Sequence, residues 1–116
     1  MDDKLANLED IIKTLGKAKG LKIFFSLKEP KTWTELEKIA DGDKNSVSRR
    51  TDELLKLGLI KVEYNPKERR PFYSLTPTGR RILELLEEIA KVYEEKVSLE
   101  EKELKWIEES LKKSEE

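Results

Sequence analysis

Hydrophobic positions along the first half of the chain recur with the spacing of amphipathic helices. The first stripe has steps of three, four and three residues, which place its members on one helix face. Its members are Leu5, Leu8, Ile12 and Leu15. Three more segments with helical patterns follow, at residues 18–29, 31–41 and 44–58, and the first of them contains the core candidates Leu21, Phe24, Phe25 and Leu27. The pattern therefore predicts four consecutive helices.

Local capping signals indicate where two of these helices begin. Thr32 and Glu35 have the spacing of a capping box, in which a hydroxyl and a carboxylate each accept a hydrogen bond from a free backbone N–H. Asp41 and Gly42 break the helix that starts there, and Asp43 is placed to cap the next one. We therefore expect two short helices joined by a tight turn.

The period of the pattern changes after the fourth helix. Residues 59–64 and 71–75 are rich in apolar and aromatic side chains and predict two strands across a charged loop of six residues, which is a β-hairpin. Thr76 and Pro77 then provide a helix start, with a hydroxyl at the N-cap and proline at the first helical position. The expected fold class is mainly α with a small β-hairpin.

The C-terminal segment has a helical pattern to the end, and two interpretations of it stay open. Ser98 and Glu101 have the spacing of a second capping box, which allows a break and a new helix at that point. A single long, bent helix is the alternative. Under either interpretation we see no internal repeat.

Composition excludes several kinds of chemistry. The 116 residues include no Cys and no His, so disulfides, thiolate chemistry, zinc fingers and a Ser-His-Asp triad are ruled out. The chain also has no glycine-rich phosphate loop and no metal-ligand cluster, and we expect neither an enzyme nor a bound metal or cofactor. No apolar run is long enough to span a bilayer, and with no signal peptide the cytoplasm is the expected location. An abundance of Lys and Glu is typical of proteins from thermophiles.

Charge is distributed unevenly although the net charge is only -1. Residues 1–43 have a net charge of -1, residues 44–81 a net charge of +6, and residues 82–116 a net charge of -6. The middle of the chain is therefore a basic island, which permits one localised anion-binding face.

The chain resembles the winged helix-turn-helix regulators of the MarR, ArsR and HxlR type. The resemblance rests on the order of helices, hairpin and helix and on the stretches SVSRRTDELLKLGLI and YSLTPTGR. The resemblance covers roughly residues 15–86, and we expect an archaeal source. It implies a DNA-binding domain at residues 1–80 and a helical dimerisation region at residues 81–116, with both terminal helices pairing between two copies. The family usually has an apolar residue where Thr51 stands, and Thr51 can be buried there if its hydroxyl bonds a carbonyl one turn back.

The resemblance also implies site residues. Residues 44–57 would be the recognition helix, with a wing tip in the hairpin loop. The expected DNA contacts are Lys44, Asn45, Ser46, Ser48, Arg49 and Arg50, with Lys67, Arg69 and Arg70 in the wing. The expected dimer interface consists of Leu5, Leu8, Ile12, Leu86, Ile89, Tyr93, Val97, Leu104, Ile107 and Leu111.

The function expected from these features is sequence-specific transcriptional regulation, most simply as a repressor. A homodimer would bind pseudo-palindromic double-stranded DNA, with its recognition helices in successive major grooves. Two alternatives stay open, namely a protein–protein interaction module of the transcription machinery and a sequence-neutral architectural DNA-binding protein. The sequence identifies no membrane partner and no small-molecule effector.

Overall fold

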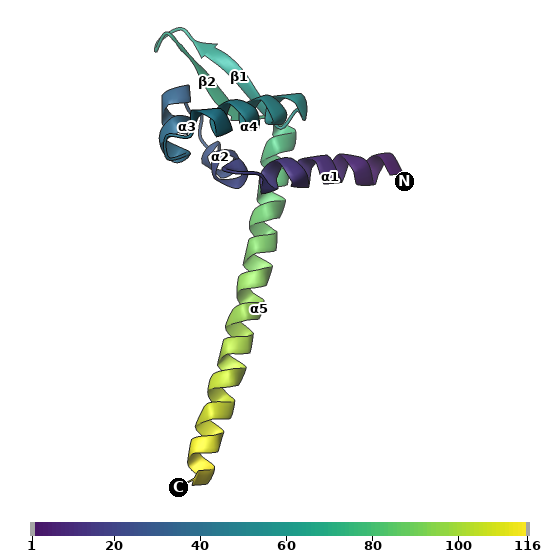
Figure 1. Ribbon diagram of the computed structural model, residues 1–116, viewed down its shortest axis with the longest axis vertical. Coiled ribbons are helices and arrows are strands. Elements are labelled where there is room, and N and C mark those ends of the chain that lie inside the picture. Colours follow the sequence, from purple (N-terminus) through teal and green to yellow (C-terminus); the bar gives the residue numbers. More distant parts are fainter. Residues whose placement is uncertain (1, 116) are drawn as a thin grey trace. The chain divides into compact units, whose positions relative to one another are not determined.

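The computed structural model describes residues 2–115, and the side chains of residues 3–112, in the element order shown in Figure 1. The helices are α1 (Asp2–Gly16), α2 (Gly20–Ser26), α3 (Trp33–Ile39), α4 (Lys44–Lys56) and α5 (Pro77–Glu115), and the strands are β1 (Ile60–Asn65) and β2 (Arg70–Leu75). The chain divides into two compact units, Met1–Leu83 and Glu84–Glu116. The first unit contains α1 to β2 and the start of α5, and the second is the remainder of α5. None of the helices in residues 2–115 is both long and apolar enough to span a membrane.

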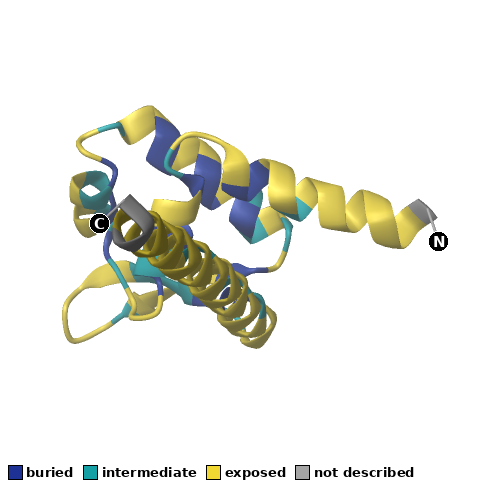
Figure 2. Cartoon of the chain, turned by 90° about the horizontal axis from the view of Figure 1, so that it is seen from below, coloured by how far each residue is buried: buried dark blue, intermediate teal, exposed yellow. Residues whose placement is uncertain are grey.

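The core of the first unit is built from α2, α3, α4 and the base of the hairpin. Its buried apolar residues are Leu15, Ile23, Phe24, Leu27, Leu36, Ala40, Val47, Leu54, Leu59, Ile60, Leu75 and Leu83. The prediction of Leu21 as a core residue is wrong, since 49% of it is exposed and the neighbouring face of α2, with Ile23 and Phe24, points inward instead. Figure 2 shows buried segments concentrated in this part of the chain, whereas most of α1 is exposed.

Helix α2 is shorter than the predicted segment at residues 18–29. The backbone amides of Leu27 and Lys28 bond to the carbonyls of Phe24 and Phe25, three residues earlier. These tight turns end the α-helical hydrogen-bond pattern before Pro30 is reached. The helix therefore ends at Ser26.

The two short helices and their turn follow the predicted capping signals. The Thr32 hydroxyl accepts a hydrogen bond from the Glu35 backbone N–H at 3.2 Å, and a Glu35 carboxylate oxygen accepts one from the Thr32 N–H at 3.1 Å. This pairing holds the pKa of Glu35 below its usual value, through the bonds from the Thr32 backbone and hydroxyl. In the turn, Asp41 and Gly42 adopt positive φ angles of 55° and 82°, and Asp43 caps α4. Glycine at 42 suits this left-handed backbone.

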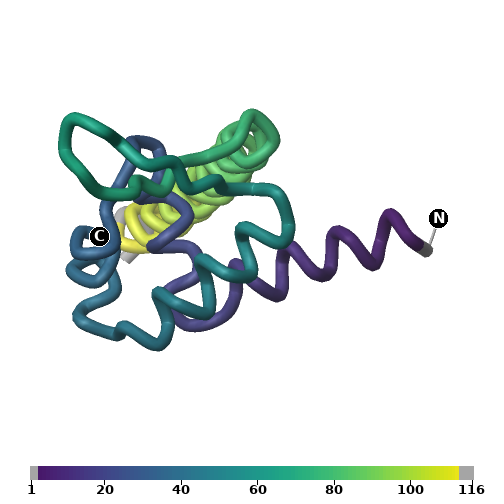
Figure 3. Tube along the Cα trace, turned by 90° about the horizontal axis from the view of Figure 1, so that it is seen from above, coloured from purple at the N-terminus to yellow at the C-terminus, as the bar shows by residue number. Residues whose placement is uncertain are grey.

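The hairpin is antiparallel, with its register running from Ile60 opposite Leu75 to Asn65 opposite Arg70. Asn65 and Arg70 are therefore strand residues, and the prediction of a six-residue loop is wrong, because only residues 66–69 connect the strands. A short bridge adds Lys31 to the edge of β2, where its N–H and C=O exchange hydrogen bonds with Tyr73 at 2.9 and 2.7 Å. Figure 3 traces the chain from α4 through this hairpin into α5.

Helix α5 starts in close contact with the base of the hairpin. The Thr76 hydroxyl accepts a hydrogen bond from the Gly79 N–H at 3.0 Å and donates one to the Gly58 carbonyl at 2.7 Å. A Cβ atom at Gly79 would lie 1.9 Å from the Leu59 carbonyl oxygen, so only glycine fits there. Between Pro77 and Glu115 the helix is unbroken, so the single-helix alternative describes it and Ser98 is not an N-cap. Ser98 lies among strong helix formers, which favour continuation over a cap.

Candidate nucleic-acid interface

The start of α4 presents an exposed polar face. Lys44, Asn45, Ser48 and Arg49 are all exposed, and their spacing of one, three and one residues places them side by side on the first turns of the helix. Backbone N–H groups at a helix start carry partial positive charge, so this end of α4 favours phosphate. Two cations and two short hydrogen-bonding side chains therefore share one surface.

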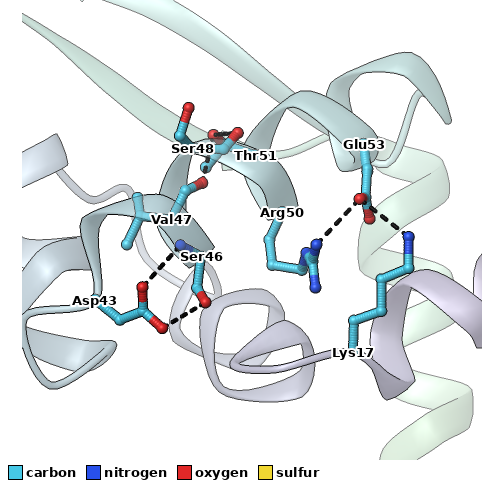
Figure 4. Close-up of polar contacts among 8 residues, drawn as sticks. All are labelled: Lys17, Asp43, Ser46, Val47, Ser48, Arg50, Thr51 and Glu53. Atoms are coloured by element: carbon cyan, nitrogen blue, oxygen red, sulfur yellow. Dashed lines mark hydrogen bonds and ion pairs between the residues drawn. The ribbon is translucent and has the colours of Figure 1, made fainter.

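Ser46 is less exposed than predicted. It is only 9% exposed, so the expectation that it lies on the exposed face is wrong. Its hydroxyl donates to an Asp43 carboxylate oxygen at 2.6 Å, and its backbone N–H donates to the other at 3.0 Å, as Figure 4 shows. These two bonds from Ser46 hold the pKa of Asp43 below its usual value. Ser46 therefore fixes the start of α4 rather than extending its outer surface.

Arg50 also points into the fold, where it bonds to Glu53 of the same helix beside Lys17, the residue that follows α1. It is 6% exposed, and its Nη2 lies 3.1 Å from Glu53 Oε1, which also accepts a hydrogen bond from Lys17 Nζ at 3.2 Å (Figure 4). Burial by itself raises the pKa of Glu53, but the hydrogen bond from Lys17 and the charge of Arg50 outweigh it, so the pKa is lowered. The expectation that Arg50 lies on an outer, backbone-facing side is thus wrong.

Thr51 confirms a local expectation. It is 2% exposed, and its hydroxyl donates to the Val47 carbonyl at 2.7 Å and approaches the Ser48 carbonyl at 3.1 Å. The polar group is satisfied inside its own helix, as the sequence argument required. The buried face of α4 can therefore include a threonine while Ser48 and Arg49 stay outside.

The hairpin loop presents the second group of cations. Lys67, Arg69 and Arg70 are all exposed. The loop is ordered by Asn65, whose side-chain oxygen accepts hydrogen bonds from the backbone N–H groups of Lys67 and Glu68 at 2.9 and 3.2 Å. The Arg69 N–H donates to the Asn65 carbonyl at 2.8 Å, and Arg69 has a positive φ of 57°. The loop is thus a fixed turn with Lys67 and Arg69 in solvent, and Arg70 is exposed beside it at the start of β2.

Ion pairs between distant residues hold the turn before α4, and sequence patterns did not reveal them. Lys19 and Lys22 of the α2 region donate to the same Asp41 carboxylate oxygen at 2.9 and 3.3 Å. The bonds from Lys19 and then Lys22 lower the pKa of Asp41. No spacing rule links residues about twenty positions apart, so an acidic residue in a tight turn was the only available signal.

The terminal helices present exposed apolar side chains. In α1, more than half of Leu5, Leu8 and Ile12 is exposed. In α5, Ile89, Tyr93, Leu104, Ile107 and Leu111 are exposed, and Leu86 and Val97 are half-buried. Exposed apolar surface of this extent is typical of an interaction site.

Comparisons with known proteins give a consistent picture of the fold. No family model matches the sequence, and no curated protein matches it. A solved structure of a proposed MarR-family transcriptional regulator from Enterococcus faecalis is 26% identical, with a TM-score of 0.67 over 78% of this chain and 86% of that one. A second proposed MarR-family regulator, from Porphyromonas gingivalis, is 28% identical, with a TM-score of 0.60 over 72% of this chain and 85% of that one.

A third structure is described in more specific terms. It is the homodimeric winged helix-turn-helix DNA-binding domain of Mb0332 from Mycobacterium bovis, a possible ArsR-family regulator, and it is 16% identical. Its TM-score is 0.65 over 79% of this chain and 85% of that one. All three neighbours are described as proposed or possible transcriptional regulators. The chain accordingly has the winged helix-turn-helix fold, and its structural neighbours are transcriptional regulators of the MarR and ArsR families.

Proposed function

We propose that the protein is a sequence-specific DNA-binding transcriptional regulator, that it acts as a repressor, and that it binds pseudo-palindromic DNA as a homodimer. The observation that carries this proposal is the exposed face of Lys44, Asn45, Ser48 and Arg49 at the start of α4. It lies on a fold shared with transcriptional regulators.

The proposed contacts follow from the geometry of B-DNA. The major groove admits an α-helix, and an arginine reads guanine through two hydrogen bonds while an asparagine reads adenine in the same way. Arg49 and Asn45 are the two side chains on α4 able to do this from its exposed face. Lys44 and Ser48 lie beside them and would contact phosphates, which fix the register of the helix on the duplex.

The hairpin loop supplies the second contact. Lys67, Arg69 and Arg70 carry three positive charges on a turn held by Asn65. Such a wing reaches the phosphates or the minor groove beside the site and adds affinity on every sequence. Base reading and backbone attraction would therefore reside on two different elements.

Dimerisation would place two recognition helices on one face of the duplex, separated by one helical turn of about 34 Å or by a multiple of it. The two-fold axis of the protein then matches the pseudo-palindrome of the DNA. A dimer that occupies its site excludes other proteins from the same promoter, which is the simplest route to repression. A regulator of this kind acts on chromosomal DNA, so we propose a cytoplasmic location.

A binding series at several salt concentrations tests the proposal. A binding site is selected from random duplexes, and fluorescence anisotropy then compares this site with scrambled DNA. We expect the selected site to bind about a thousandfold more tightly or better. Equal affinity for both duplexes would indicate an architectural protein, and no binding to either would indicate a protein–protein module.

A charge-matched pair of variants sharpens this test. Replacing Lys44 and Arg49 with alanine should abolish the preference for the selected site. Replacing Lys102 and Lys105 of α5 removes the same charge from a different part of the chain and should leave the preference intact. If both variants lose the preference equally, α4 is not the base-reading element.

A further inference from the structure

A mostly apolar stripe runs along one face of α5, and the steps between its members follow the same order from the N-terminal end and from the C-terminal end. Its first half has steps of four, three and four residues, and consists of Ile82, Leu86, Ile89 and Tyr93. Its second half repeats these steps, and consists of Glu100, Leu104, Ile107 and Leu111. A step of seven residues, from Tyr93 to Glu100, joins the two halves, so the midpoint lies between Lys96 and Val97. We call these eight residues the α5 stripe.

The members near the middle of the α5 stripe are well exposed. Ile89, Tyr93 and Leu104 are 65%, 67% and 61% exposed. Large apolar side chains in such a regular stripe along one helix face match the seam of a helix pair. The partner has to present a stripe of the same length and spacing, and a second copy of α5 does so.

Mirror symmetry of the spacing allows two orientations of that second copy. In a parallel pair each residue would face itself. In an antiparallel pair centred between residues 96 and 97, Leu86 faces Ile107 of the partner subunit, and Ile89 faces Leu104 of the partner subunit. Both arrangements bring apolar residues together, so the apolar members do not choose between them.

Glu100 is the charged member of the stripe, and it decides the orientation. In a parallel pair it would face Glu100 of the partner subunit, and two like charges at a seam repel each other. In the antiparallel pair it faces Tyr93 of the partner subunit, whose hydroxyl can donate a hydrogen bond to the carboxylate. A single polar residue within an otherwise apolar seam commonly selects one register in this way.

We propose that two copies of α5 pair antiparallel through the α5 stripe, with Tyr93 of each copy opposite Glu100 of the other. The proposal deepens the proposed function, because it rests on the homodimer and gives that homodimer an orientation and a register. The pairing occurs twice in each dimer, once on either side of the two-fold axis, as an isologous interface requires.

A second apolar stripe lies beside the α5 stripe. It consists of Leu85, Val92, Leu99 and Trp106, each one residue before a member of the α5 stripe. Leu85 and Val92 lie four and three residues from Ile89 and border the seam, whereas Leu99 and Trp106 lie three or four residues from no member of the α5 stripe. Substitutions at Leu99 and Trp106 should leave the pairing unchanged.

Cysteine cross-linking of the full-length chain tests the orientation, and the absence of native cysteine keeps the background clean. The variants are Ile89→Cys and Leu104→Cys, expressed singly and together, at positions exposed enough to leave the fold intact. With a rise of 1.5 Å per residue, the two Ile89 positions of an antiparallel pair lie about 22 Å apart along the helix axis, too far for a disulfide. We therefore expect a disulfide-linked dimer on a non-reducing gel only when the two variants are co-expressed.

Two outcomes would overturn the proposal. Cross-linking of either single variant with itself to the same extent would indicate a parallel pair, and no cross-link in any combination would exclude the α5 stripe as the seam. The control is Lys91→Cys co-expressed with Lys102→Cys, two exposed positions centred on the same midpoint but on the opposite face of α5, which should give no dimer band.

Spin labels give an independent measure. Labels attached at Ile107→Cys should lie about 32 Å apart along the axis in the antiparallel pair, against about 10 Å in a parallel one. Replacing Glu100 with leucine removes the residue that selects the orientation, so a population at the shorter distance should appear. Absence of that population in the leucine variant, with the longer distance retained in full, would show that Glu100 does not select the orientation.

The wild-type binding series separates this proposal from the proposed function. A chain that prefers its selected DNA site but never cross-links overturns the antiparallel pairing and leaves the proposed function standing. A chain that cross-links as expected but binds no DNA supports the antiparallel pairing and overturns the proposed function.

Discussion

The first unit and the C-terminal unit solve the problem of apolar surface in opposite ways. The first unit buries Phe24, Leu36 and Leu54 completely within one chain. The C-terminal unit leaves residues such as Ile89, Tyr93 and Trp106 about two-thirds exposed. The charges differ as well, since residues 44–81 have a net charge of +6 and residues 82–116 a net charge of -6. Apart from the exposed apolar face of α1, the first unit encloses its own core, and its basic segment is suited to an anion, whereas the C-terminal unit is suited to a protein partner.

The largest expected effect is on the stability of the first unit. Replacing Phe24 with alanine should lower the free energy of unfolding by about 3–5 kcal/mol, because it removes a fully buried ring. Replacing Trp106 with alanine should change it by less than about 0.5 kcal/mol, because that side chain is mostly in solvent. Urea unfolding at one protein concentration compares the two. Equal losses would mean that the C-terminal unit is buried in solution.

Breaking the C-terminal unit should instead separate assembly from folding. Aspartate at both Ile89 and Tyr93 places charge on the proposed seam and should yield a folded monomer. Its affinity for the selected DNA site should fall by about a hundredfold or more, because the second half-site is no longer tethered to the first. Analytical ultracentrifugation measures the mass, and circular dichroism checks the fold. A wild-type chain that is itself monomeric at high micromolar concentration would exclude the homodimer.

A change on α4 should act on specificity alone. Arg49→Ala should weaken binding to the selected site by about 1–3 kcal/mol if Arg49 makes a bidentate base contact. Lys56→Ala, in the last turn of the same helix, is the matched control and should have a smaller effect. An equal loss on selected and scrambled DNA would reassign Arg49 to a phosphate.

A change in the wing should act on affinity without changing specificity. Replacing both Arg69 and Arg70 with alanine should reduce the slope of log affinity against log salt by about 0.9 for each phosphate that the wing no longer neutralises. Scrambled DNA should show the same reduction as the selected site. An unchanged slope would mean that the wing does not touch the DNA backbone.

The smallest expected effect is the pH dependence of the contact between α1 and α4. The pKa of Glu53 is lowered from 4.5, so the charged carboxylate stabilises the folded state above that pH. This contribution should be lost as the pH falls through the lower pKa of the folded protein. The melting temperature of Glu53→Gln should therefore depend less on pH below 4.5 than that of the wild type. Identical profiles would show that Glu53 contributes nothing to this dependence.

Local signals in the sequence predicted much of the fold, because their causes lie within a few residues. The capping box of Thr32 and Glu35, the cap at Asp43 and the buried hydroxyl of Thr51 each depend on one helical turn. The hairpin and the helix start at Thr76 are of the same kind. The expectation of a winged helix-turn-helix came from the order of these elements and from a family resemblance, and the likeness to a solved winged helix-turn-helix domain confirmed it.

The errors at the site all concern which way a side chain faces on its helix. Ser46 and Arg50 were expected outside, because charge and polarity at the start of a recognition helix resemble a DNA contact. Both point inward, since Asp43 lies before one and Glu53 and Lys17 lie beside the other. Lys17 is more than thirty residues from Glu53 in the sequence, and no periodicity encodes such a pair. Leu21 was expected in the core, but Ile23 is buried in its place. The reason is similar, because the neighbouring elements decide which face of a two-turn helix is buried.

The junction between the wing and α5 has a mechanical consequence. Thr76 holds the Gly58 carbonyl, and the backbone of Gly79 lies against the Leu59 carbonyl with no room for even a methyl group. The base of the wing and the first turn of α5 are therefore joined by a hydrogen bond and by direct backbone contact. We therefore expect a displacement of the hairpin on meeting a duplex to shift the start of α5 as well. A ligand or a contact that stiffens one side of the junction would in turn restrict the other.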